Sequence, residues 1–198
     1  SLVGSEMCIR DRAGPIAGRD YGPQEPEQVA QPLIEETMEV SIPIFQLGYK
    51  GDAPQRGEVG ARQELLGELA CEALLGNSTP LYARLYREGL INRNFSYGYE
   101  AMPGATFLAA GGESKDPEAV RQAVQQEAER IVREGVDPDL WRRIKKGSYG
   151  GKVRSLNSFE NLCVGQAQSF FAGSDLLDFP RLCLLYTSDA ADDRISVD

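Results

Sequence analysis

Residues 74–100 read LLGNSTPLYARLYREGLINRNFSYGYE, and this stretch decides the fold. Gly76 is placed to end one helix, and Asn77-Ser-Thr-Pro80 offers a hydroxyl N-cap followed by proline at the first position of the next helix. A strand should follow, because small and polar residues alternate with the aromatic residues Phe95, Tyr97 and Tyr99. Two helices joined this tightly are expected to lie against a third element, which we predict to be an antiparallel sheet.

The segments on either side supply the rest of the predicted sheet. Upstream, apolar residues alternate with polar ones at Met38, Val40, Ile42 and Ile44, which predicts a half-buried strand. Pro43 places that strand at an edge or a bulge, because proline has no N–H to donate. Downstream, residues 105–111 have the composition of a strand that forms a hairpin with the aromatic strand.

Helical signals fill most of the remaining chain. Apolar spacing and capping residues predict helices at 58–75, 80–89, between Pro117 and Gly135, from Pro138 onward, and at 158–171. Strands that are adjacent in sequence pair antiparallel, and so many helices are expected to cover one face of the sheet. The predicted fold class is therefore α+β, an antiparallel sheet with helices packed on one face, and the helices of Val120 and Trp141 are expected to back the hairpin.

The two ends of the chain are expected to lie outside this fold. Residues 1–12 and 183–198 show no helical or strand period, and both resemble peptides translated from sequencing-adapter DNA, so we predict that they are non-native scars. Ordinary disordered tails are the alternative. Residues 13–32, which are rich in proline, read as a linker, which leaves 33–182 as one truncated domain. Of the cysteines outside the scars, Cys71 and Cys163 are each predicted to be small core residues.

Composition excludes several classes of function. The chain has 198 residues and a formal net charge of -9, which disfavours nucleic acid and anionic membrane as partners. No apolar run reaches the roughly 20 residues of a membrane-spanning helix. The four scattered cysteines form no C-x-x-C pair, and no secretory N-terminal pattern is present, so a cytoplasmic location is expected. The chain contains no histidine, so no catalytic imidazole and no histidine metal ligand is available.

No local motif indicates an active site. Residues 147–152 contain three glycines and a lysine, but their spacing is one residue short of a phosphate-binding loop and no strand precedes them. Gly147, Gly150 and Gly151 instead predict a helix kink or a close approach of another backbone. No catalytic and no metal-ligating residue is predicted in this chain, and its carboxylate pairs are expected to be surface charge.

Several phrases, in order, resemble one peptidase family. They are VSIPIFQLGYK (40–50), LGNSTPLY (75–82), LYREGLI (85–91), IKKG (144–147) and LNSFE (156–160). Together they resemble the C-terminal, non-catalytic half of the insulinase and pitrilysin (inverzincin) zinc metallopeptidases, which have an α/β roll fold. The phrases look closest to bacterial members associated with modification of elongation factor P.

The resemblance implies a two-lobed zinc endopeptidase. In such enzymes the N-terminal half holds zinc through H-x-x-E-H, and the C-terminal half closes over a peptide substrate without a metal of its own. It follows that this chain has no cofactor, that zinc belongs to a missing N-terminal half, and that the chain is inactive alone. Its expected partners are that catalytic half, or a partner subunit, and the peptide.

The resemblance also suggests three substrate-binding candidates. Many relatives carry an arginine and, seven residues later, a tyrosine that contact substrate, whereas this chain has Tyr86 and Arg93 there, with the two residue types exchanged. Tyr86, Arg87 and Arg93 are thus candidates, with packing or solvent exposure as the alternative for each. The exchange keeps open a degenerate, non-catalytic partner subunit that acts as a binding or assembly module. An unrelated peptide-binding domain of the same architecture is a third possibility.

Overall fold

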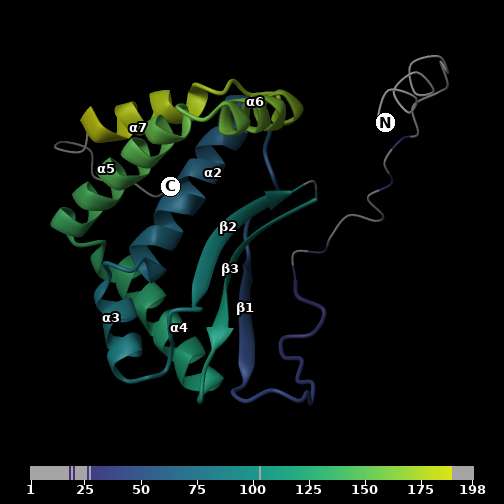
Figure 1. Ribbon diagram of the computed structural model, residues 1–198, viewed down its shortest axis with the longest axis vertical. Coiled ribbons are helices and arrows are strands. Elements are labelled where there is room, and N and C mark those ends of the chain that lie inside the picture. The colour runs from purple at the N-terminus through teal and green to yellow at the C-terminus, as the bar shows by residue number, and fades with distance from the viewer. Residues whose placement is uncertain (1–17, 19, 21–25, 27, 103, 189–198) are drawn as a thin grey trace, which may run out of the picture.

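A computed structural model describes residues 18, 20, 26, 28–102 and 104–188. Within these residues the chain forms three strands and six helices (Figure 1). In chain order they are β1 (Ile44–Lys50), α2 (Gly57–Leu75), α3 (Pro80–Arg87), β2 (Ser96–Met102), β3 (Ala105–Glu113), α4 (Pro117–Glu134), α5 (Pro138–Ser155), α6 (Phe159–Ala172) and α7 (Asp178–Ser188). The predicted α+β class is confirmed, and the predicted elements occur in the predicted order, followed by α7, which was not predicted.

The sheet has the order β1-β3-β2, and both pairings are antiparallel. The hairpin predicted from the aromatic strand is present, with Ser96 opposite Gly111 and Met102 opposite Ala105. The first strand was placed wrongly, because pairing with β3 begins only at Ile44, opposite Glu113. β3 ends at Glu113, so residues before Ile44 have no strand beside them, and Met38, Val40 and Ile42 are exposed.

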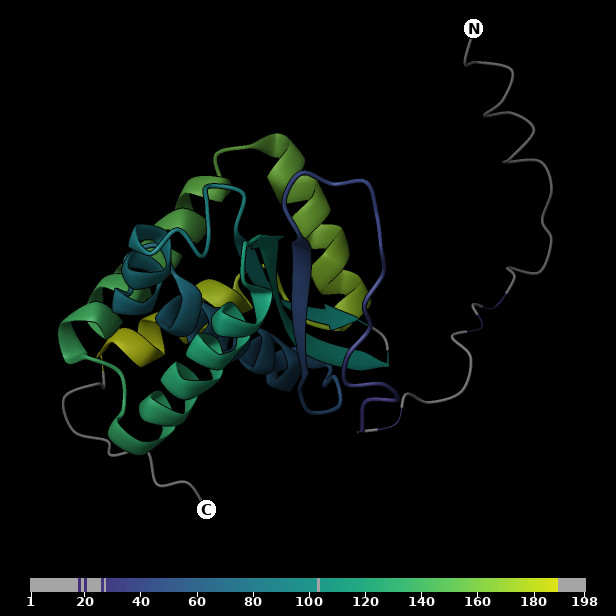
Figure 2. The ribbon, with the colours of Figure 1, turned by 90° about the horizontal axis from the view of Figure 1, so that it is seen from below.

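The helix pair from the opening stretch forms as predicted. The Thr79 hydroxyl accepts a hydrogen bond from the N–H of Tyr82 at 3.1 Å, and Pro80 begins α3. The main core lies between this helix pair, α4 and one face of the sheet. Its buried members are Phe45, Leu74, Leu75, Leu81, Leu85, Ile91, Phe95, Ala110, Val120 and Val124. In Figure 2 the helices α2 to α5 gather on one side of the strands, as the sequence predicts.

A second cluster holds the C-terminal helices onto α2. It contains Leu65, Leu69, Ala73, Leu140, Ile144, Leu182 and Cys183. α5 therefore packs on α2 and α7, which makes it a further layer and corrects the expectation that the Trp141 helix backs the hairpin. Leu140 and Ile144 form the apolar stripe of α5. They pack against side chains of α2 and therefore do not contact the sheet. Figure 1 shows α5 and α7 outside α2.

The C-terminal boundary differs from the expectation. Residues 183–188, assigned to a scar, continue α7, and Cys183 is buried. Phe179, Leu182 and Cys183 recur at the three- and four-residue steps of a buried helical stripe, which explains why this segment packs. Residues 1–12 and 189–198 lie outside the described part of the chain. The described residues of the 13–32 segment form no helix or strand.

Cysteine burial provides a direct check of this arrangement. Cys71 is buried, as predicted, but Cys163 is exposed because α6 buries none of its side chains. Burial, reinforced by the carboxylates of Glu68 and Glu72, raises the pKa of the Cys71 thiol to about 12. Since the thiolate is the reactive form, we expect iodoacetamide at pH 8 to modify Cys163 rapidly and Cys71 only after denaturation. Peptide mass mapping measures both rates, and equal rates would contradict the packing of α2.

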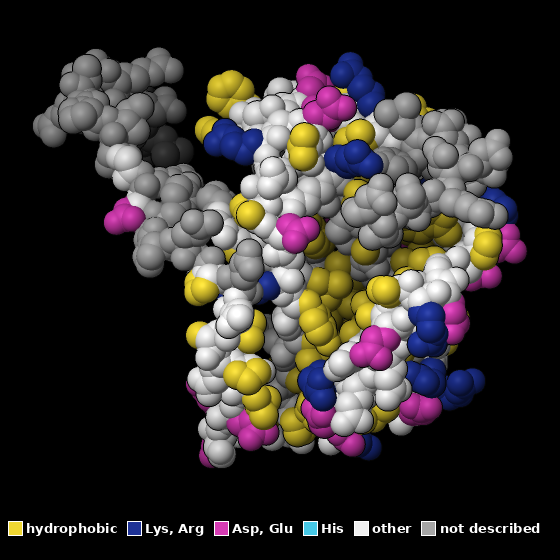
Figure 3. Space-filling view, turned by 180° about the vertical axis from the view of Figure 1, so that it is seen from behind, with side chains coloured by type: hydrophobic (Ala, Val, Ile, Leu, Met, Phe, Trp, Pro, Cys, Tyr) yellow, Lys and Arg dark blue, Asp and Glu magenta, His cyan; other side chains and the backbone are white. Residues whose placement is uncertain are grey.

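No helix in the described ranges is both long enough and apolar enough to cross a membrane. Several large hydrophobic side chains are nevertheless exposed in each of two segments. Before β1 they are Val29, Leu33, Ile34, Met38 and Val40, and on α6 they are Phe159, Val164, Phe170 and Phe171. α6 lies beyond one end of the sheet, where the Arg56 guanidinium donates to the carbonyl of Phe171 at 3.0 Å (Figure 1). Seen from behind, hydrophobic side chains also line a hollow beside a helix rich in charged residues (Figure 3).

Candidate functional site: the open face of the sheet

The two faces of the sheet differ in what covers them. Side chains alternate across a strand, and those of Phe45, Tyr97 and Ala110 point toward the helices. The Tyr97 hydroxyl donates to Glu72 on α2 at 2.8 Å, and burial together with this hydrogen bond raises the Tyr97 pKa. Tyr99 lies on the same side, with its ring against Gly67. The side chains of Tyr97 and Tyr99 therefore join the sheet to α2.

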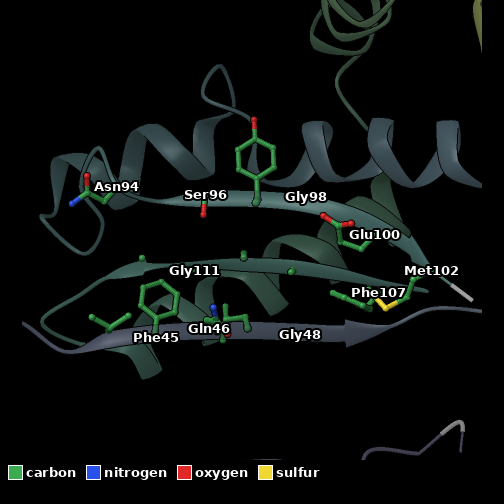
Figure 4. Close-up of a pocket in the computed structure, with 16 residues that line it drawn as sticks. Phe45, Gln46, Gly48, Asn94, Ser96, Gly98, Glu100, Met102, Phe107 and Gly111 are labelled. Atoms are coloured by element: carbon green, nitrogen blue, oxygen red, sulfur yellow. The ribbon is translucent and has the colours of Figure 1, made fainter. Parts of the chain in front are cut away.

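The opposite face is a hollow of about 700 Å³. Residues of all three strands line it, and Figure 4 views these strands side by side. Phe107 and Met102 stand at one end, and Asn94 stands at the other. No residue of a described helix is among those that line the hollow, so its floor consists of strand backbone and of the strand side chains that point outward.

The middle of the hollow is almost free of side chains. The register places Gly48 opposite Ala109 and Ala109 opposite Gly98, so one row across all three strands carries a single methyl group. A Cβ at Gly48 would meet no atom within 4 Å, and a Cβ at Gly98 would reach only the Glu100 carboxylate at 4.0 Å. Both backbones lie in the ordinary φ range. Neither glycine is therefore required by packing or by conformation, although glycine within a strand costs roughly 0.5–1 kcal/mol relative to alanine.

The hollow has an acidic character. Glu100 is the one charged residue among those that line it. At the other end, the Glu113 carboxylate accepts hydrogen bonds from the amides of Asn92 at 2.6 Å and Asn94 at 3.3 Å. Alternation from Gly111 and Ala109 puts Glu113 on this same face of β3. Carboxylates thus stand near both ends of a floor that is otherwise small or uncharged.

The three predicted substrate contacts lie elsewhere. Tyr86 and Arg87 are exposed on α3, where the Tyr86 ring stacks on Tyr82 with centroids 6.1 Å apart. Arg93 is exposed in the loop before β2, next to Asn94. None of the three lines the hollow. The structure thus groups Tyr86 and Arg87 on one helix and separates them from the open face.

Sequence reasoning missed the residues that form the floor. Gly48 and Gly98 stand inside strands, and an isolated glycine in a strand is a known sign of close approach by a ligand or another backbone. That signal was present in LGYK and SYGYE. The sequence alone did not show that the two glycines are neighbours, because only the strand register aligns them across β3.

The described residues do not fit a zinc site. No three of the histidine, cysteine, aspartate and glutamate side chains among them are grouped so that they could hold a metal ion. The complete sequence also lacks histidine. No catalytic step can therefore be assigned to a metal held by these residues.

Comparison with known proteins connects this architecture to one family. Residues 10–148 match the family described as Peptidase M16 inactive domain. The chain is 29% identical over 160 residues to the uncharacterized zinc protease YmfH of Bacillus subtilis (strain 168), covering 78% of the chain and 36% of that protein. A crystal structure of an M16-like peptidase from Alicyclobacillus acidocaldarius has the same fold, with a TM-score of 0.70 and 22% identity over 73% of this chain and 35% of that one.

The chain thus spans about a third of the length of both relatives. The family match covers more than half of the chain, and it falls on the strands, on α2 to α4 and on the first turns of α5. The sheet and helix layer described above is therefore the inactive C-terminal domain of a member of the M16 family of zinc peptidases.

Proposed function

We propose that this chain is the substrate-enclosing, non-catalytic lobe of a zinc-dependent endopeptidase, and that the open face of its sheet is the wall that meets the substrate. The observation that carries the proposal is the uncovered row of Gly48, Ala109 and Gly98, which lies on a domain whose family relatives include a protein named as a zinc protease. No internal packing explains these glycines. Glycine within a strand often marks a place where a ligand or another backbone approaches closely.

The geometry of this face suits an extended peptide better than a compact ligand. Strands lie about 4.8 Å apart, so the floor is roughly 10 Å wide across the three strands. The hollow is open along its length, and its lining offers backbone, amide and hydroxyl groups as well as Phe107 and Met102. Unfolded segments can lay their backbone on such a floor.

The partner in this proposal is a catalytic N-terminal half, or a separate subunit, that holds the zinc. The matched part of this chain covers about a third of the length of each relative, and an inactive domain requires a catalytic one. The exposed aromatic residues of α6 support a covering partner, because large exposed apolar patches mark protein–protein contact sites. Tyr86, Arg87 and Arg93 stay predictions of substrate contact, as do a cytoplasmic location and an association with elongation factor P modification.

A degenerate partner subunit is the second candidate. It is favoured by Tyr86 and Arg93, where the residue types of the expected substrate contacts are exchanged, and by their position away from the hollow. In that case the complete protein would bind unfolded peptides but would not cleave them.

Zinc-dependent cleavage distinguishes the two candidates. The natural, longer protein should cut an unfolded fluorogenic peptide, lose activity with a chelator and regain it with zinc, while the 198-residue chain alone should neither cut the peptide nor bind zinc in isothermal titration. Peptide binding by the longer protein without cleavage under any zinc concentration would establish the partner subunit instead. Stoichiometric zinc binding by this chain would contradict both.

A further inference from the structure

We propose that the open face binds one extended peptide segment that runs across the strands, over Gly48, Ala109 and Gly98, with a basic side chain of the peptide beside Glu100. The inference rests on the proposed function and adds the direction of the bound segment and the charge that it carries.

The floor crosses the sheet at right angles to its strands. Gly48, Ala109 and Gly98 occupy one cross-strand row, so a chain laid along that row would meet no side chain larger than a methyl group. Running along a single strand is less favourable. A segment that followed β2 would pass over Ser96, Glu100 and Met102 within one strand length.

Larger residues stand on both sides of this row. Gln46 and Ser96 occupy the row two residues away on one side, and Phe107 and Glu100 occupy the row two residues away on the other. At about 3.3 Å per residue these two rows are roughly 13 Å apart. That width holds one extended backbone with its side chains and excludes a second.

The negative charge of Glu100 favours a peptide with a basic side chain. Glu100 stands at the β2 end of its row, and Phe107 separates it from Lys50 at the β1 end, whose ammonium donates to the carbonyl of Pro26 at 2.9 Å. No cationic side chain is among the residues that line the hollow. A peptide ammonium or guanidinium can approach the Glu100 carboxylate over the β2 edge, whereas an acidic side chain placed there would meet a like charge.

Two variants test the small-residue row and the charge of Glu100 separately. Gly98→Val adds a side chain in open space, so it should fit this chain and obstruct the peptide, and Glu100→Lys reverses the charge at the wall. The matched controls are Gly150→Ala, which also adds a Cβ in open space, and Glu129→Lys, which reverses an exposed charge on α4. The probes are two fluorescent unfolded peptides that are identical except for lysine or glutamate at one central position.

Anisotropy titrations of the 198-residue chain then give the result. The unmodified chain should bind the lysine peptide about threefold more tightly than the glutamate peptide, as expected for one exposed ion pair. Glu100→Lys should reverse this preference, and Gly98→Val should weaken binding of both peptides by about tenfold at unchanged circular dichroism and without any loss of melting temperature. The two control variants should bind like the unmodified chain.

The outcomes are separable from those of the proposed function. If Gly98→Val binds as tightly as the unmodified chain, or if Glu100→Lys leaves the preference unaltered, the inference is overturned while peptide binding itself still supports the substrate-enclosing role. If the unmodified chain, shown to be folded by circular dichroism, binds neither peptide, the proposed substrate wall fails as well.

Discussion

Phe95→Ala is expected to lower the free energy of unfolding by about 4 kcal/mol, which is the largest effect of any single substitution considered for this chain. Phe95 is buried, and its ring lies 6.4 Å from the ring of Phe45, 6.2 Å from that of Tyr82 and 6.3 Å from that of Tyr97. These rings come from β1, α3 and β2. Truncation therefore leaves a cavity where two strands meet the helix layer.

Phe170→Ala is the matched control for this prediction. Phe170 is also phenylalanine, but it is 73% exposed on α6, so its loss should change the free energy of unfolding by less than about 0.5 kcal/mol. Urea unfolding followed by circular dichroism measures both. Equal effects of the two substitutions would mean that the aromatic cluster is not the centre of the core.

The second large effect is expected at Gly67 on α2. A Cβ at this position would lie 2.4 Å from the ring of Tyr99, so a leucine cannot fit unless β2 moves away from α2. We expect Gly67→Leu to destabilise the chain by about 2 kcal/mol through overpacking. The effect opposes helix propensity, because leucine is a better helix former than glycine by about 1 kcal/mol.

Gly150→Ala, also a substitution of a helix glycine, is expected to change the free energy of unfolding in the opposite direction. Gly150 lies within α5, and a Cβ there would meet no atom within 4 Å. The substitution should raise the free energy of unfolding by up to about 1 kcal/mol, the helix-propensity difference. Urea midpoints that move in opposite directions for Gly67→Leu and Gly150→Ala would verify the contact between α2 and β2. A gain in stability at both positions would contradict it.

Local signals predicted much of this fold. The Thr79 and Pro80 start of α3, the hairpin of β2 and β3, and the α+β class all depend on nearby residues, and all are present. The prediction made from the glycines of α5 was wrong. They predicted a kink or a close approach, yet α5 is an unbroken helix and a Cβ at Gly147, Gly150 or Gly151 would meet nothing.

The misplaced features depend on partners that are distant in sequence. The start of β1 is set by where β3 ends, because Met38 to Ile42 alternate as a strand would but have no neighbour to pair with. The place of the Trp141 helix depends on α7, and the exposure of Cys163 depends on α6 having little to pack against. Prediction of the open face would have required the cross-strand register, which no local sequence pattern contains.

The most direct test of the central claim compares two neighbouring methyl groups on β3. Ala109 lies in the row of Gly48 and Gly98 on the open face, whereas the Ala110 side chain is 4% exposed and packs in the main core against the helices. In methyl NMR of the labelled 198-residue chain, titration with an unfolded peptide should shift the Ala109 signal and leave the Ala110 signal in place. A peptide that binds without moving Ala109, or that moves Ala110 instead, would contradict the assignment of the open face as the substrate wall.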